Sequence, residues 1–231
     1  AWASRSFFAT DNEVALFTRN APECRVRVQA MGNGVDTDYF SVDDTRSSPF
    51  PPGELPVVFT GAMDYLPNVD AATWFASDVL PGLLQRWPAV RFYVVGRNPS
   101  AAVLALASDR IVVTGTVDDV RPYLQHAATV VAPLRIARGI QNKILEAMAM
   151  GRPVIASATC AAAVDAVAGQ ELLTATSPEE YIAAISQVLE APETATAMGG
   201  AARQRVVERY TWEAHMKAID PYLPAPSLRE T

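Results

Sequence analysis

Short apolar runs alternate with longer amphipathic stretches along most of the 231-residue chain. The apolar runs are continuous, as is typical of strands that are covered on both faces of a parallel sheet. Such runs occupy residues 57–60, 91–95, 111–114, 128–132 and 154–156. Strands that alternate with helices imply right-handed crossovers. The pattern therefore predicts an α/β fold with a doubly wound, Rossmann-like parallel sheet.

The amphipathic stretches predict the helices that connect these strands. They cover residues 68–87, 101–107, 120–127, 141–150 and the Ala-rich tract 158–169. Asn68 is the expected N-cap of the first. Another helix is expected to start at Ser177, because Ser177, Pro178 and Glu180 form the sequence of a capping box with proline in the first turn.

The ends of the chain fall outside this alternation. Residues 1–40 read as the end of a separate unit, 41–55 as a polar, Pro-rich linker, 56–208 as the main domain and 209–231 as a C-terminal amphipathic helix. The chain lacks an initiator Met and opens in mid-pattern, so we expect that an N-terminal part is missing.

Composition narrows the class of protein. Nineteen Lys and Arg against 25 Asp and Glu give a net charge of −6, which argues against nucleic acid as the main partner. The longest uncharged stretch, 122–134, is too short to span a bilayer. The start of the sequence has no charged-then-apolar pattern, so we do not expect secretion. Two cysteines without metal spacing fit a reducing compartment, so a cytoplasmic protein is expected.

The segment RGIQNKILEAMAMGRPVIA, residues 138–156, combines an apolar helix with phosphate-friendly residues at its start. In open parallel sheets, ligands bind where strand ends feed helix N-termini. Gly139 allows a close approach of the backbone, and the first N–H groups of the helix attract anions. Arg135, Arg138 and Lys143 add three cations. The segment therefore predicts a phosphate site.

Glu146 follows one turn after this start, about 6 Å further along the helix axis. A carboxylate there can accept hydrogen bonds from the vicinal hydroxyls of a ribose. Asn142, Lys143 and Glu146 then outline a site for a nucleoside diphosphate. The alternative is that Lys143 and Glu146 form an exposed i, i+3 pair worth a few tenths of a kcal/mol, and that the cations belong to a solvated loop.

LEAMAMGRPVI, residues 145–155, resembles the nucleotide-sugar site of the retaining, family 4-like glycosyltransferases of the GT-B fold. Further motifs resemble that family in the same order: GNGVD at 32–36, FTGAM at 59–63, VVGRNP at 94–99, VTGTVDDVRPYL at 113–124 and YTWEAH at 210–215. The resemblance covers roughly residues 20–220. It extends to a subgroup of sugar transferases associated with exopolysaccharide loci.

The resemblance implies a two-domain enzyme that works with no metal and no covalent cofactor. A nucleoside-diphosphate sugar, expected to be a UDP-sugar, binds the C-terminal domain, and a glycan or lipid-linked acceptor binds the N-terminal domain. This chain looks like the donor-binding domain plus a short remnant of the N-terminal one, inactive by itself. The full-length enzyme would lie at the inner membrane face.

Functional residues of the family match positions of this sequence. Glu146 matches the glutamate that binds the ribose, and the diphosphate-binding loop matches Gly139, Ile140 and Asn142. Gly61 matches the glycine-rich turn under the phosphates, Gly96 and Arg97 a loop near the nucleotide, and Val117 the place where the backbone meets the base.

Two departures from the family pattern bear on catalysis. Arg138 stands where the family has its first glutamate, and GAMDYLPN at 61–68 lacks the usual Arg and Lys of that loop. We therefore expect Arg138 and Lys143 to supply the lost positive charge and to act as the catalytic cations.

Other functions have less support from the sequence. A sugar-nucleotide epimerase would need histidines that this chain lacks, since His126 and His215 are its only two. A non-catalytic nucleotide-binding domain is favoured by Arg138 but opposed by the intact 145–155 block. A zinc site is opposed by the absence of ligand spacing, and His126 is expected to be a structural residue at a helix end.

Overall fold

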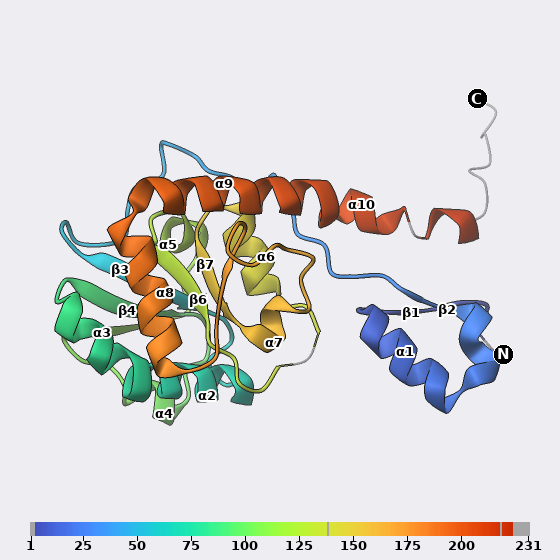
Figure 1. The fold of residues 1–231 in the computed structure, drawn as a ribbon, viewed down its shortest axis with the longest axis horizontal. Helices are drawn as coiled ribbons and strands as arrows, with labels where there is room; N and C mark the ends of the chain where they lie inside the picture. The colour runs from blue at the N-terminus through green and yellow to red at the C-terminus, as the bar shows by residue number, and fades with distance from the viewer. Residues whose placement is uncertain (1–2, 138, 218, 224–231) are drawn as a thin grey trace.

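The computed structural model describes residues 3–137, 139–217 and 219–223. Within them, a six-stranded parallel sheet forms the centre of the main domain, in the order β5-β4-β3-β6-β7-β8 (Figure 1). Its strands are β3 (Leu55–Thr60), β4 (Val90–Val95), β5 (Ile111–Gly115), β6 (Thr129–Ala132), β7 (Val154–Ser157) and β8 (Leu173–Ala175). The doubly wound sheet and all five predicted strands are confirmed. The three-residue β8 was not predicted.

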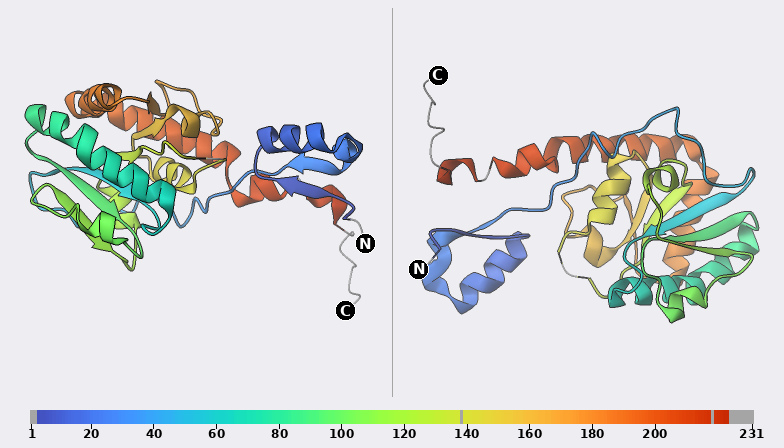
Figure 2. Two further views of the ribbon diagram at one scale, coloured as in Figure 1. Left: turned by 90° about the horizontal axis from the view of Figure 1, so that it is seen from below. Right: turned by 180° about the vertical axis from the view of Figure 1, so that it is seen from behind.

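Helices cover both faces of this sheet (Figures 1 and 2). The helical elements are α2 (Leu66–Trp74), the π-helical turn η2 (Phe75–Val79), α3 (Leu80–Arg86), α4 (Ala101–Leu104), α5 (Arg121–Gln125), α6 (Asn142–Ala149), α7 (Ala158–Ala161), α8 (Pro178–Glu190) and α9 (Pro192–Arg209). α8 packs against α3 and η2, whereas α9 packs against α6. The capping box at Ser177 is present, with Glu180 as its partner.

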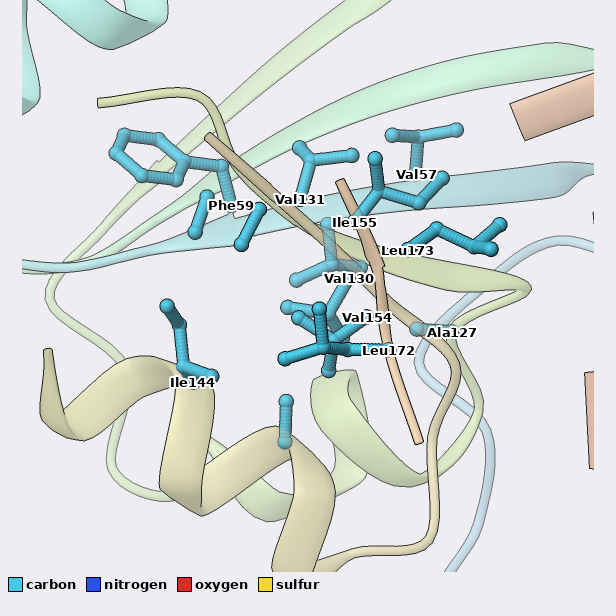
Figure 3. Packing of buried hydrophobic residues seen from close by; sticks show 14 of the residues in the cluster. Val57, Phe59, Ala127, Val130, Val131, Ile144, Val154, Ile155, Leu172 and Leu173 are labelled. Atoms are coloured by element: carbon cyan, nitrogen blue, oxygen red, sulfur yellow. The ribbon is translucent and has the colours of Figure 1, made fainter. Parts of the chain in front are cut away.

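The hydrophobic core lies between the sheet and these helices. Figure 3 shows Ile144 of α6 facing valine and isoleucine side chains of β6 and β7. Ile144, Val131 and Ile155 are each 0% exposed. Burying such a side chain contributes roughly 1.5–3 kcal/mol. The packing therefore fixes α6, which carries the predicted site, rigidly against the central strands.

Three helix predictions were wrong in detail. Pro67 occupies the first turn of α2, so that helix begins at Leu66, and Asn68 lies inside it rather than at its N-cap. The Ala-rich tract forms only the four-residue α7 before the chain turns. The stretch 209–231, expected as one helix, holds α10 (Trp212–Met216) and η3 (Asp220–Tyr222) in its described part.

The N-terminal segment is a small unit set apart from the main sheet (Figures 1 and 2). It comprises β1 (Ser6–Phe8), α1 (Asp11–Asn20), η1 (Pro22–Arg27) and β2 (Val28–Ala30), with β1 and β2 parallel. The Tyr222 ring lies against this unit, since the Arg5 guanidinium stands 4.8 Å from its centroid. The end of the described chain thus packs on its beginning.

The Pro-rich stretch 41–55 is attached to the main domain along its length. Gln125 Nε2 donates to the carbonyl of Asp43 at 2.8 Å. The His126 ring lies 2.7 Å from the Arg46 carbonyl, which confirms its structural role at the end of α5. Phe50 packs edge-on against Tyr93.

Candidate functional site

The strand order reverses between β3 and β6, and a crevice opens at the carboxyl end of these two strands. Its volume is about 550 Å³. The loops after β3 and β6 line it with Tyr65, Pro67, Arg135, Ile136, Ala137 and Gln141. Such a reversal is where open α/β sheets bind their ligands. We call this cavity the switch crevice.

The loop after β6 leads into α6. Gly139 adopts a φ of +67°, and Gln141 places no side-chain hydrogen bond on the first turn of the helix. Asn142 is exposed, and its Oδ1 accepts a hydrogen bond of 2.9 Å from Asn33 Nδ2. A hydrogen bond therefore connects the start of α6 to Asn33, in the segment that precedes the main domain. The free backbone N–H groups of a helix lie at this end.

Lys143 is buried, with 9% of its surface exposed. Its Nζ donates to Asn68 Oδ1 at 2.6 Å and lies 4.1 Å from the centroid of the Phe59 ring. Burial lowers the pKa of Lys143 to about 7, and the nearby Cys160 and Glu146 offset only part of this shift. The interpretation of Lys143 as a solvated surface cation was wrong.

Gly61 and Gly96 lie in contact beside this lysine. A β-carbon at position 61 would stand 2.7 Å from Asn68 Nδ2 and 3.0 Å from Lys143 Nζ. A β-carbon at position 96 would stand 1.7 Å from the Gly61 carbonyl oxygen. The missing side chain of Gly61 thus makes room for the pair of Lys143 and Asn68.

Glu146 is half-buried one turn further along α6. Burial raises the pKa of its carboxyl group, and Lys143 opposes that shift. Among the described residues, no ion pair within 4.0 Å joins Glu146 to Lys143, and the Glu146 carboxylate makes no side-chain hydrogen bond. The alternative of an exposed i, i+3 pair was therefore wrong.

The described residues do not form the cluster that was expected from Arg135, Arg138 and Lys143. Arg135 is bound to Asp70, with its Nε 3.0 Å from Oδ2, and its guanidinium stands 5.5 Å from the centroid of the Trp74 ring. Arg138 lies outside the described residues. Lys143 therefore stands in the first turn of α6 while Arg135 is turned toward α2.

Arg97 and Val117 lie at the ends of the next two strands. The carbonyl of Arg97 accepts a hydrogen bond of 2.8 Å from the N–H of Met63, so the loops after β3 and β4 are joined, and the Arg97 side chain is exposed. Val117 is half-buried beyond β5, the edge strand. The structure thus brings Gly61, Gly96 and Lys143 together and places Val117 two strands away from β3.

A second, larger cavity of about 1100 Å³ separates the N-terminal unit from the main domain. Its walls include Thr10, Glu13, Gly139, Ile140, Asp165 and His215. Gly139 and Ile140 therefore border this interunit cleft, while Ala137 lines both cavities. Ala137 and residues 139–141 therefore lie between the switch crevice and the interunit cleft.

Sequence reasoning missed two contributors to these sites. Asn68 was taken for a cap, although Pro67 before it signals that the helix has already begun. Nothing in the sequence indicated His215, whose Nε2 is buried without a hydrogen-bond partner in the described structure. Burial lowers the pKa of His215. In the same part of the chain, no group of three or more metal-ligating side chains occurs, and no helix is long and apolar enough to cross a membrane.

The comparisons with known proteins agree with this fold. The profile of the family described as "Glycosyl transferases group 1" matches residues 54–191. The chain therefore belongs to the group 1 glycosyltransferases. No curated protein matches it.

Solved structures of glycosyltransferases share the GT-B fold. Alr3699/HepE from Anabaena in complex with UDP is 15% identical, with a TM-score of 0.80, over 96% of this chain and 64% of HepE. A glycosyltransferase from Rickettsia africae is 14% identical (TM-score 0.77), over 95% and 62% of the two chains. Sucrose-phosphate synthase from Thermosynechococcus elongatus is 21% identical (TM-score 0.75), over 94% and 56%. This chain thus spans less than two thirds of the length of each.

Proposed function

We propose that this chain is the donor-binding domain of a retaining, family 4-like glycosyltransferase and that it binds a UDP-sugar. The observation that carries the proposal is the position of α6, whose N-terminus follows β6 at the reversal of the strand order, with Lys143 and Glu146 in its first two turns. Family membership and the HepE structures with UDP and UDP-glucose support it.

Different residues of the site bind the diphosphate, the ribose and the base of the nucleotide. N–H groups of Gly139, Ile140 and Asn142 hold the diphosphate, because the start of a helix attracts anions. Glu146 accepts hydrogen bonds from the ribose hydroxyls. Gly96, Arg97 and Val117 border the base, on the side of β4 and β5.

Transfer proceeds with retention at the sugar and without metal or cofactor. Arg138 and Lys143 stabilise the departing diphosphate, because positive charge in a protected site offsets the negative charge that develops there. The acceptor, a glycan or lipid-linked sugar, approaches from the interunit cleft across loop 137–141. We place the reaction in the cytoplasm, at the inner membrane face, in exopolysaccharide synthesis.

Titration calorimetry tests the binding step. We expect UDP to bind more tightly than GDP or ADP, and Arg138→Ala and Lys143→Ala each to weaken UDP binding. Lys217→Ala is the matched control, because Lys217 is exposed on the turn after α10. Unchanged affinity in both variants would rule out the two catalytic cations, and the absence of nucleotide binding would rule out the function.

A sugar-transfer assay tests whether the acceptor is bound by a domain outside this chain. We expect this chain alone to bind UDP-sugar but to transfer little or no sugar to an acceptor. Turnover by the chain alone would contradict the assignment of acceptor binding to another domain.

A further inference from the structure

The surroundings of the Lys143 amine offer too few acceptors for a permanent ammonium ion. An ammonium group carries three N–H donors, whereas Asn68 Oδ1 is the one acceptor found for it among the described residues. Asn68 is itself held in place, because its Nδ2 donates to the Ala62 carbonyl at 2.9 Å. The Phe59 ring covers the amine from β3.

The charges around this amine also fail to stabilise a cation. Lys143 is the second residue of α6, where the helix dipole disfavours positive charge. Two ionisable groups of the described residues act on it: Glu146 from its own helix and Cys160 from α7. Burial raises the pKa of both, so each carries less negative charge. The neighbours from α2 and β3, Asn68 and Phe59, are neutral.

We propose that Lys143 is the site of proton uptake coupled to donor binding, and that Asn68 is the residue that positions its amine. This inference rests on the proposed binding of a nucleoside diphosphate at the tip of α6. When the diphosphate arrives, the Nζ lone pair accepts one proton from solvent, and no bond of the ligand breaks. The proton returns to solvent when the diphosphate leaves.

The coupling makes UDP affinity depend on pH in a defined direction. Because binding takes up a proton, affinity falls as the pH rises above the pKa of the free amine, about 7. The fall reaches up to about tenfold per pH unit. This measurement needs only the unmodified chain. An affinity that stays constant from about pH 7 to pH 9 would overturn the inference.

Calorimetry in buffers of different ionisation enthalpy counts the protons directly. At about pH 8 we expect uptake of most of one proton per UDP bound. Lys143→Arg, always charged, should bind UDP without uptake. Asn68→Asp places a carboxylate beside the amine and so favours its protonated form before UDP binds. This variant should therefore show no proton uptake although Lys143 is still present. Lys217→Arg should retain it.

The outcomes separate this inference from the proposed function. UDP binding without proton uptake, or with equal uptake in Lys143→Arg, overturns the role of Lys143 and leaves the nucleotide site standing. The absence of UDP binding at any pH overturns both.

Discussion

Gly199 of α9 lies directly against the carbonyl group of Gly151, the residue that follows the C-cap of α6. A β-carbon at position 199 would stand 2.0 Å from that oxygen. Four residues on, the Arg203 guanidinium donates to the carbonyl of Ala149, the last residue of α6. The long C-terminal helix therefore holds α6 from its far end, while the site lies at its start.

Gly199→Ala should destabilise the protein, because backbone atoms of two elements would have to move apart. We expect a loss of about 2 kcal/mol or more in the free energy of unfolding, as for other overpacking changes. Gly200→Ala is the control, since a β-carbon there meets nothing within 4 Å. That change should stabilise α9 by about 0.5–1 kcal/mol. Urea denaturation measures both, and equal effects would show that the contact carries no energy.

The side chain of Gln125 holds the Pro-rich stretch 41–55 against the end of α5. Its Oε1 accepts from the Asp43 N–H and from the Arg46 guanidinium, and the residue is 6% exposed. Gln125→Leu leaves these groups unpaired, at about 1–3 kcal/mol. We expect trypsin to cut after Arg46 roughly tenfold faster, because local opening becomes easier. The exposed Gln170 supplies the control, and a Gln170→Leu chain cleaved as fast as Gln125→Leu would contradict this role.

The fold followed from the sequence because its strands are continuous apolar runs, a local signal that burial on both faces produces. β8 was not predicted because only Leu173–Ala175 pairs with the sheet, and so short a segment shows no hydrophobic periodicity. The Ala-rich tract misled for a related reason: alanine favours a helix in isolation, but here the chain turns after Ala161.

The candidate site was less accessible to sequence reasoning. Spacing along α6 placed Asn142, Lys143 and Glu146 in its first two turns, as observed. It could not show that Lys143 turns inward to Asn68, 75 positions away, or that Arg135 pairs with Asp70. These contacts depend on which loops the sheet brings together, and that information is tertiary.

Lys143→Met should change how stability depends on pH. In the native protein the pKa of Lys143 is about 7, below the ordinary lysine value of 10.5, so between these values the unfolded chain binds more protons. The contribution of Lys143 to stability therefore rises with pH across this window and is lost as the pH falls toward 7. Relative to Lys143→Met, unmodified protein should gain up to about 1.4 kcal/mol per pH unit. Parallel curves for the two proteins, measured by urea denaturation, would contradict the burial of the amine.

Glu146→Gln separates recognition of the ribose from recognition of the phosphates. A carboxylate that accepts two hydroxyl groups forms charge-assisted bonds, and the amide replaces them with weaker ones. We expect the affinities for UDP and for uridine each to fall roughly tenfold, by about 1.4 kcal/mol. Affinity for inorganic pyrophosphate should not change, because that ligand has no ribose.

The control is Glu208→Gln, an exposed carboxylate on the last turn of α9 that should leave all three affinities unchanged. The pH supplies a second check on the same residue. Because burial raises the pKa of Glu146, its carboxylate is lost on acidification earlier than that of an exposed glutamate. Uridine, which carries no phosphate, should then bind the unmodified chain more weakly as the pH falls, but should bind Glu146→Gln equally at each pH. Titration calorimetry measures both trends. If Glu146→Gln lowered pyrophosphate affinity as much as uridine affinity, Glu146 would be acting on the phosphate end of α6 and not on the sugar.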